Sequence, residues 1–197
     1  TSERINLITK ISEPHIVKNI YGWEHWDDGK ISPELAWICF TSGSTGKPKA
    51  VMVPFDGLEN MIYEQIKMFE INEKSNVLWS MSPGFDASFS DVCVSIFSGA
   101  TLYPIDDKSL KNSDLLFDFI NSNKITYADL TPTLSNILSK KDTTLKSVVF
   151  GGEVANPDSI RKLTEKMKVI NVYGPTEATV CTSMIQCQTD WSLPSIG

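Results

Sequence analysis

Residues 147–173 read SVVFGGEVANPDSIRKLTEKMKVINVY, and this stretch decides the fold. Two apolar runs, Ser147–Phe150 and Val169–Val172, flank a helical sequence at Pro157–Lys166. Asn156 before Pro157 is typical of a helix N-cap followed by the first helical position. The stretch therefore predicts a strand, a helix and a second strand, which is the repeating unit of parallel sheets.

The same alternation extends through most of the chain. Further strands are predicted at Leu35–Phe40, Ala50–Val53, Val77–Ser80, Ala100–Tyr103 and Ile125–Asp129. Further helices are predicted at Gly57–Phe69, Ser88–Phe97, Ser113–Asn121 and Thr133–Leu138. Ser88 with Asp91 matches a capping box, and Gly99 fits a helix terminator. We expect an α/β fold with a largely parallel sheet flanked by helices over residues 34–197, and a peripheral segment at 1–33.

Composition limits the classes of partner. The 197 residues have a formal net charge of −6, which argues against nucleic acid or an anionic membrane as partner. Apolar runs are too short for a transmembrane helix, and the first ten residues lack the apolar core of a signal peptide, so a cytoplasmic location is the default expectation. The four cysteines show no CxxC spacing and are expected to be buried free thiols. Two histidines leave little material for a zinc site.

A second informative stretch is Thr41-Ser-Gly-Ser-Thr-Gly-Lys-Pro-Lys49, which follows the apolar run at 35–40. Glycines let backbone N–H groups approach an anion, hydroxyls add donors, and Lys47 and Lys49 add charge. These residues favour a nucleotide triphosphate as ligand. A Walker P-loop needs a glycine where Thr41 stands and a Ser or Thr where Pro48 stands, so that motif is excluded. We expect the loop to continue into a strand, and a solvated hairpin turn is the alternative.

Three segments carry a family resemblance. Thr41–Lys49, Phe85-Asp-Ala-Ser88 and Asn171-Val-Tyr-Gly-Pro-Thr-Glu177 resemble, in order, core motifs of the adenylate-forming superfamily. The amino-acid-activating adenylation domain of nonribosomal peptide synthetases is the best match, followed by D-alanine-carrier-protein ligases. The resemblance spans about Glu34 to Gly197 and implies a flavodoxin-like subdomain. In the family, a ribose-binding aspartate, a hinge and a C-terminal domain with a catalytic lysine follow. We therefore expect an incomplete core that lacks the C-terminal domain and full activity.

The resemblance assigns nucleotide-binding roles. The catalytic residues would be Lys47, Thr176 and Glu177, with Glu177 binding Mg²⁺ and Thr176 donating to the α-phosphate region. Tyr173 would stack on adenine and Asn171 would bind its amino group. The remaining residues expected to contact ATP are Thr41, Ser42, Gly43, Ser44, Thr45, Gly46, Gly152, Glu153 and Gly174. The alternatives are a surface turn at 173–177 and a simple strand-to-loop glycine pair at 151–152.

The resemblance also assigns an amino-acid site. Asp86 would pair with the substrate α-ammonium, and branches that use fatty or aryl acids tend to lack it. Motif offsets place Ala87, Ser90, Asp129, Val149, Gly151, Val172, Val180 and Cys181 around the substrate side chain. Most are small or apolar, so Asp129 should meet a cation or a hydrogen-bond donor of a basic amino acid, glutamine or tyrosine. Helix capping is the alternative role for Asp86 and for Asp129.

The expected reaction is ATP-dependent formation of an aminoacyl-AMP. A carrier-protein domain bearing phosphopantetheine would then receive the amino acid. The competing functions are an acyl- or aryl-CoA ligase, which shares the nucleotide motifs, and a non-catalytic binding fragment.

Overall fold

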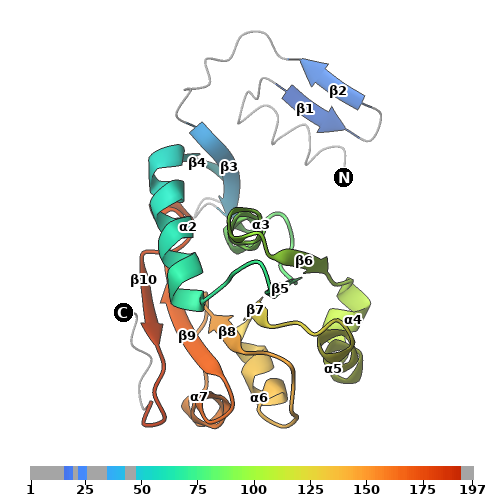
Figure 1. Ribbon diagram of the computed structural model, residues 1–197. Helices are drawn as coiled ribbons and strands as arrows, with labels where there is room; N and C mark the ends of the chain where they lie inside the picture. Colours follow the sequence, from blue (N-terminus) through green and yellow to red (C-terminus); the bar gives the residue numbers. More distant parts are fainter. Residues whose placement is uncertain (1–15, 20–21, 26–34, 43–47, 192–197) are drawn as a thin grey trace. The chain divides into compact units, whose positions relative to one another are not determined.

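The computed structural model of the chain describes residues 16–19, 22–25, 35–42 and 48–191 (Figure 1). The chain divides into two compact units, Thr1–Glu59 and Asn60–Gly197. In the first unit, β1 (Ile16–Asn19) pairs antiparallel with β2 (Gly22–His25). Likewise β3 (Leu35–Ser42) pairs antiparallel with β4 (Pro48–Pro54), with Thr41 opposite Lys49. The predicted strand after the phosphate loop is therefore confirmed, while Gly43–Lys47 lie outside the described residues.

The second unit is built on a six-stranded sheet of order β10-β9-β8-β7-β5-β6. Its strands are β5 (Asn76–Trp79), β6 (Thr101–Pro104), β7 (Tyr127–Leu130), β8 (Ser147–Phe150), β9 (Lys168–Tyr173) and β10 (Ser183–Gln186). Five strands are parallel, and β10 joins the edge antiparallel to β9. The predicted α/β fold with a largely parallel sheet is confirmed.

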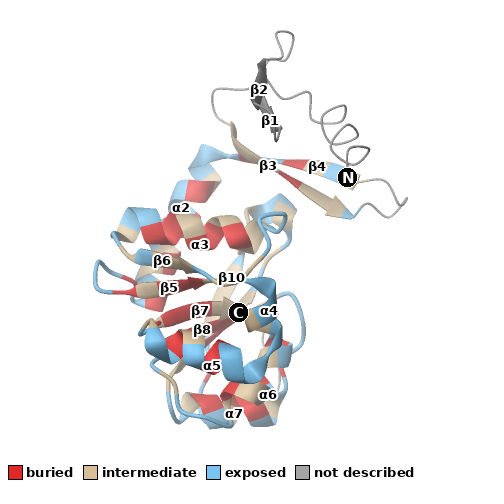
Figure 2. Ribbon diagram, turned by 90° about the vertical axis from the view of Figure 1, so that its right-hand side faces the viewer, coloured by how far each residue is buried: buried red, intermediate tan, exposed pale blue. Residues whose placement is uncertain are grey.

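Helices cover both faces of this sheet (Figure 2). Helices α2 (Phe55–Phe69) and α3 (Asp86–Ser98) lie on one face. On the other face lie α5 (Ser113–Ser122), α6 (Ser135–Leu138) and α7 (Pro157–Thr164), with the short α4 (Asp107–Lys111) leading into α5. Two 3₁₀ turns, η1 (Pro132–Leu134) and η2 (Thr176–Ala178), follow β7 and β9.

Alternate residues of the strands point to opposite faces, and this divides the core. Leu78, Leu130, Val148, Phe150 and Val169 pack with the helices of the α5 and α7 face, including Leu116, Ile120, Ile160 and Leu163. Each fully buried apolar side chain of this kind contributes about 1.5–3 kcal/mol. The face under α2 and α3 carries more polar groups, because Ser88, Asp91 and Gln65 are all buried there. The first face is therefore the main apolar core, and the second is the more polar face.

The ends of several helices follow the sequence signals. Gly99 caps α3 with a left-handed φ of 74°, as predicted. The side chain of Asn156 accepts from Ser159 N at the start of α7, which confirms that cap. The capping box at the start of α3 is wrong: Phe85 is the N-cap residue, and no side chain caps the helix. Ser88 lies inside α3 and accepts a hydrogen bond of 2.7 Å from Trp79 Nε1.

Other boundaries also differ from expectation. The predicted helix at Thr133–Leu138 is a 3₁₀ turn followed by one turn of α-helix. Helix α4 and strand β10 were not predicted. All four cysteines are free; three are buried as expected, and Cys181 is partly exposed.

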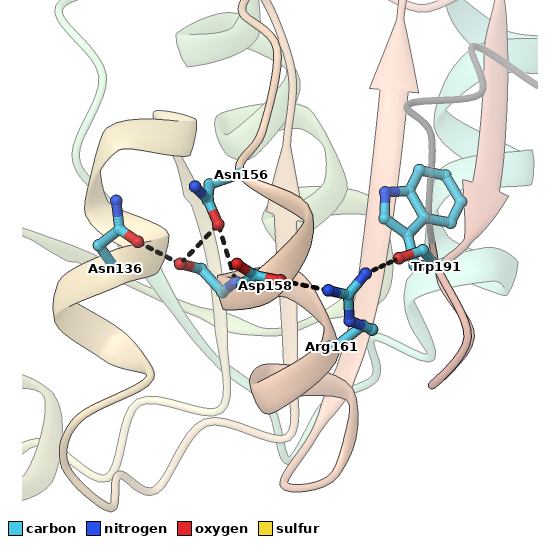
Figure 3. A network of polar contacts seen from close by, with 6 residues as sticks. Asn136, Asn156, Asp158, Arg161 and Trp191 are labelled. Carbon is cyan, nitrogen blue, oxygen red and sulfur yellow. Dashed lines mark hydrogen bonds and ion pairs between the residues drawn. The ribbon is translucent and has the colours of Figure 1, made fainter.

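A polar network fixes the end of the second unit (Figure 3). Ser159 of α7 donates its hydroxyl to the Asn136 side chain of α6, and Arg161 Nη1 donates to the Trp191 carbonyl at 2.6 Å. The first bond ties α6 to α7, and the second ties the segment after β10 to α7. The edge strand β10 is thus fixed by two contacts: its pairing with β9, and the bond between Arg161 of α7 and Trp191, which follows β10.

Candidate functional site

Within the second unit, predicted site residues lie at the carboxyl ends of the parallel strands, among them Asp86, Gly151 and Tyr173. The chain passes from β5 to β6 on one side of it, and the next strand, β7, lies on the other side of β5. The switch point of the sheet is therefore between β5 and β7. Ligands of such sheets bind at this point. Ser80 follows β5, and its hydroxyl donates to the Asp129 carbonyl of β7 at 2.8 Å, so one hydrogen bond spans the switch point.

Asp86 and Thr176 meet at this edge. The Thr176 hydroxyl donates to Asp86 Oδ2 at 2.5 Å, although 90 residues separate the two positions. The other carboxylate oxygen of Asp86 accepts from Ala87 N at 2.8 Å. Asp86 is the first residue of α3 and not its N-cap, so helix capping does not explain it. The common edge predicted for these motifs is present.

The segment between β9 and β10 has an unusual backbone. Thr179 and Val180 both adopt positive φ, at 57° and 64°, which is rare for β-branched residues. A Cβ atom at Gly174 would lie 2.4 Å from Val180 O and 2.6 Å from Cys181 Cα. The segment folds back so closely over Gly174 that only glycine fits there. Residues expected to contact nucleotide and those expected to contact amino acid thus share one tight turn.

The glycine pair after β8 serves two purposes. A Cβ at Gly151 would lie 2.6 Å from Val172 Cγ2, so this glycine allows β8 and β9 to approach at their ends. Gly152 has a φ of 78° and open space around it, which suits close approach by a ligand. Glu153 follows and accepts a hydrogen bond of 3.3 Å from Thr133 Oγ1.

Most predicted side-chain pocket residues lie on the sheet face under α2 and α3. Asp129 pairs in register with Val149, and Val172 contacts the Gly151 position, so these four residues share one face of the sheet. Ala87 and Ser90 lie on α3, and the Ser90 hydroxyl donates to Gln65 Oε1 of α2 at 2.6 Å. Val180 and Cys181 reach the same region from the turn after η2: Gln65 also hydrogen-bonds the Cys181 thiol. Gln65 therefore connects α2, α3 and this turn.

Burial and neighbouring charges raise the pKa of several ionisable groups on this face. Burial raises the pKa of Asp129 to about 7, and the Asp86 charge adds to the rise. Asp129 is partly exposed, and the η1 turn after it has no side-chain cap, so it is not a helix cap. Burial and the Asp129 charge raise the pKa of the Cys181 thiol to about 11. The pKa of the fully buried Tyr127 is also raised, first by burial and then by Asp129 and Asp91.

Two residues of this face were missed from the sequence. Asp91 on α3 is buried, and the local pattern assigned it to a capping box instead. Gln65 on α2 is only 4% exposed. A signal for Gln65 existed, because it stands at helical spacing within the apolar stripe of Leu58, Met61, Ile62 and Phe69. A polar residue in such a stripe indicates a buried polar contact.

The nucleotide motif after β9 is partly open to solvent. The Tyr173 side chain at the end of β9 is 49% exposed, and Asn171 two residues earlier is buried. Glu177 is exposed in η2. Within the described ranges no three His, Cys, Asp or Glu residues cluster as a metal site. A magnesium ion at Glu177 would fit, because Mg²⁺ is commonly held by one or two carboxylates together with substrate phosphates.

Residues 9–197 match the family described as AMP-binding enzyme. The chain belongs to the AMP-binding enzyme family. Bacitracin synthase 3 of Bacillus licheniformis is 33% identical over 153 residues, which are 77% of this chain and 2% of that protein. Nonribosomal peptide synthetase ftmPS of Neosartorya fischeri is 33% identical over 179 residues, which are 90% of this chain and 8% of that protein.

A solved structure agrees with these relatives. The Vibrio cholerae adenylation domain AlmE, in complex with glycyl-adenosine-5'-phosphate, superimposes with a TM-score of 0.71 at 28% identity, over 84% of this chain and 32% of that chain. The resemblance to adenylation domains of nonribosomal peptide synthetases is confirmed, for a part of their N-terminal core. This AMP-binding chain spans only a small part of the relatives it matches. None of the helices in the described ranges has the length and apolar character to cross a membrane.

Proposed function

We propose that this chain activates an amino acid with ATP, forming an aminoacyl-AMP and releasing pyrophosphate. One observation carries the proposal: the Thr176 hydroxyl lies 2.5 Å from the Asp86 carboxylate at the switch edge of the sheet. The residue proposed to hold the substrate ammonium and the residue proposed to contact the α-phosphate are therefore adjacent. The reacting carboxylate of an amino acid lies two bonds from its ammonium nitrogen, so this spacing suits attack on the α-phosphorus.

The chemistry requires two anions to meet. The amino-acid carboxylate oxygen forms a bond to the α-phosphorus while the bond to the pyrophosphate oxygen breaks. When the amino acid binds, its ammonium group pairs with the Asp86 carboxylate and replaces the Thr176 hydroxyl as the hydrogen-bond donor to it. The Thr176 hydroxyl is then free to donate to the α-phosphate, where negative charge develops. Binding of the amino acid thereby prepares the donor for the nucleotide.

Further residues are proposed to contact the nucleotide. The exposed ring of Tyr173 stacks on adenine, and Asn171 binds the adenine amino group. Gly152 admits the ligand closely, and Gly174 and Glu153 are further proposed contacts. Residues 41–47 of the loop between β3 and β4, with Lys47 as the cation, bind the β- and γ-phosphates. Glu177 holds Mg²⁺, which neutralises phosphate charge when bound.

The substrate is a large polar amino acid. Small residues at Ala87, Ser90 and Gly151 leave room for a long side chain, and Asp129 supplies an acidic group on the same face of the sheet. This combination favours a basic amino acid, glutamine or tyrosine. The product passes to a phosphopantetheine-bearing carrier domain in a second step.

Amino-acid-dependent exchange of labelled pyrophosphate into ATP tests the proposal, with the polypeptide that contains this chain. We expect exchange with at least one polar amino acid and none with fatty or aryl acids. Asp86→Ala should abolish it, and the matched change Asp118→Ala on the exposed face of α5 should not. Acyl-AMP formation from a fatty or aryl acid, with none from amino acids, would assign the chain to the CoA ligases instead. ATP binding without any exchange would indicate a binding module.

A further inference from the structure

Asp91 is a buried acid without a partner. It lies in the middle of α3 with 1% of its surface exposed. Neither of its carboxylate oxygens has a hydrogen-bond partner in the structure, whereas the nearby Ser95 hydroxyl bonds the backbone carbonyl of Asp91. Burying a carboxylate without a partner costs on the order of several kcal/mol, so such a group calls for an explanation. The oxygens of Asp91 are unused acceptors.

The side chain lies on the inner side of α3. Ser88, Asp91 and Ser95 share one helical stripe and are all buried, and Ser88 accepts from Trp79 of β5. The stripe therefore faces the sheet. Tyr127 and Asp129, two residues apart on β7, lie on the sheet face that α2 and α3 cover, since the Tyr127 ring stacks on Phe69 of α2.

The Asp129 charge acts on the Asp91 carboxyl. Burial raises the pKa of Asp91 well above its usual range, and the Asp129 charge raises it further. Both acids act on Tyr127, and Asp129 acts on Cys181. The ionisable groups around the pair are thus Asp86 on α3, Tyr127 on β7 and Cys181 after η2. None of these three is a cation.

We propose that Asp91 and Asp129 together form a two-carboxyl subsite that binds the cationic end of a basic amino-acid side chain. This rests on the proposed function and narrows its substrate class from polar to basic. An ammonium group has three donors and no acceptor, so it pairs with carboxylates and not with neutral protonated acids. In the free protein the raised pKa values of Asp91 and Asp129 keep both acids largely protonated below pH 7. Binding of the cation releases protons from them to solvent, and the two carboxylates then face the substrate charge.

The first experiment measures pyrophosphate exchange with lysine, ornithine and norleucine, using the polypeptide that contains this chain. Norleucine matches the lysine side chain without its ammonium group. We expect the wild type to prefer a basic substrate and Asp91→Asn to lower its kcat/KM by at least about 10-fold, with norleucine unchanged or improved. Asp118→Asn on the exposed face of α5 is the matched control and should leave the ratio unchanged. Asp91→Asn should melt no lower than the wild type, because it removes an unpaired buried acid.

A second measurement needs no variant. Calorimetric titration of the wild type at pH 6, in two buffers of different ionisation enthalpy, counts protons released on binding non-hydrolysable lysyl- and norleucyl-adenylate analogues. The lysine analogue should release at least about one proton more than the norleucine analogue, because both acids ionise on binding the cation. Equal proton counts, or an unchanged lysine-to-norleucine ratio in Asp91→Asn, would overturn the inference while amino-acid activation stands. Exchange with no amino acid at all would overturn the proposed function and this inference together.

Discussion

Among glycine-to-alanine variants in the turns of the second unit, Gly174→Ala should lower the stability most. The new Cβ would lie 2.4 Å from Val180 O, 2.6 Å from Cys181 Cα and 2.7 Å from Thr182 N. All three are backbone atoms, so no side-chain rotation can relieve the overlap, and the chain must move by about 1 Å. Overpacking of this kind costs about 1–3 kcal/mol, and backbone contacts place this variant at the upper end.

Thermal unfolding followed by circular dichroism measures the effect. At about 3 kcal/mol, a chain of this size should lose about 6–12 °C in Tm. Gly84→Ala is the control, because its Cβ would meet only Ser82 Oγ at 3.9 Å. That change should be neutral or slightly stabilising, since alanine restricts the unfolded chain. Equal melting temperatures for the two variants would refute the geometry of the turn over Gly174.

Further predictions concern the proposed chemistry. Glu177→Gln should remove most pyrophosphate exchange without lowering Tm, because the side chain is exposed in η2 and glutamine has nearly the same shape; an unchanged rate at saturating Mg²⁺ would refute its role. Asp86→Asn should raise KM for the amino acid about 10-fold or more and leave KM for ATP unchanged. Lys47→Ala should raise KM for ATP more than KM for the amino acid, and the reverse pattern would exclude the phosphate-binding role. Because burial raises the pKa of Asp129 to about 7 from an unfolded value of 3.8, the native state holds a proton that the unfolded state lacks between these values. Stability should therefore fall as pH rises from 4 to 7, and Asp129→Asn should flatten that slope in melts across this range.

The regular part of the fold could be predicted because each strand and helix carries its own signal. Ser147–Phe150 is a strand with the predicted boundaries, and Asn156 caps α7 as predicted. Helix α4 was missed because five residues hold too little periodicity to detect, although Asp106 caps it. Strand β10 was missed because an antiparallel edge strand after a glycine-containing turn breaks the alternation that predicted the others.

The sequence was sufficient to predict that the candidate site lies at one edge of the sheet, but not which side chains contact each other there. Strand ends placed Asp86 and Thr176 together, because parallel strands end on one side. The position of Asp91 beside Asp129 depends on which face of the sheet α3 covers, and that is a tertiary property. The local pattern of Ser88 and Asp91 matched a capping box instead, but the helix begins at Asp86, three residues before that pattern requires.

The tight turn over Gly174 has a consequence for altering substrate preference. Val180 and Cys181 belong to the same few residues as Thr176 and Glu177, so a bulkier or smaller side chain at 180 would displace the groups proposed to hold the nucleotide. Laboratory evolution that targets this turn should produce mostly slow enzymes, whatever amino acid they prefer. Positions 129 and 149 stand in paired strands away from the turn. Libraries built there should change preference while keeping the rate.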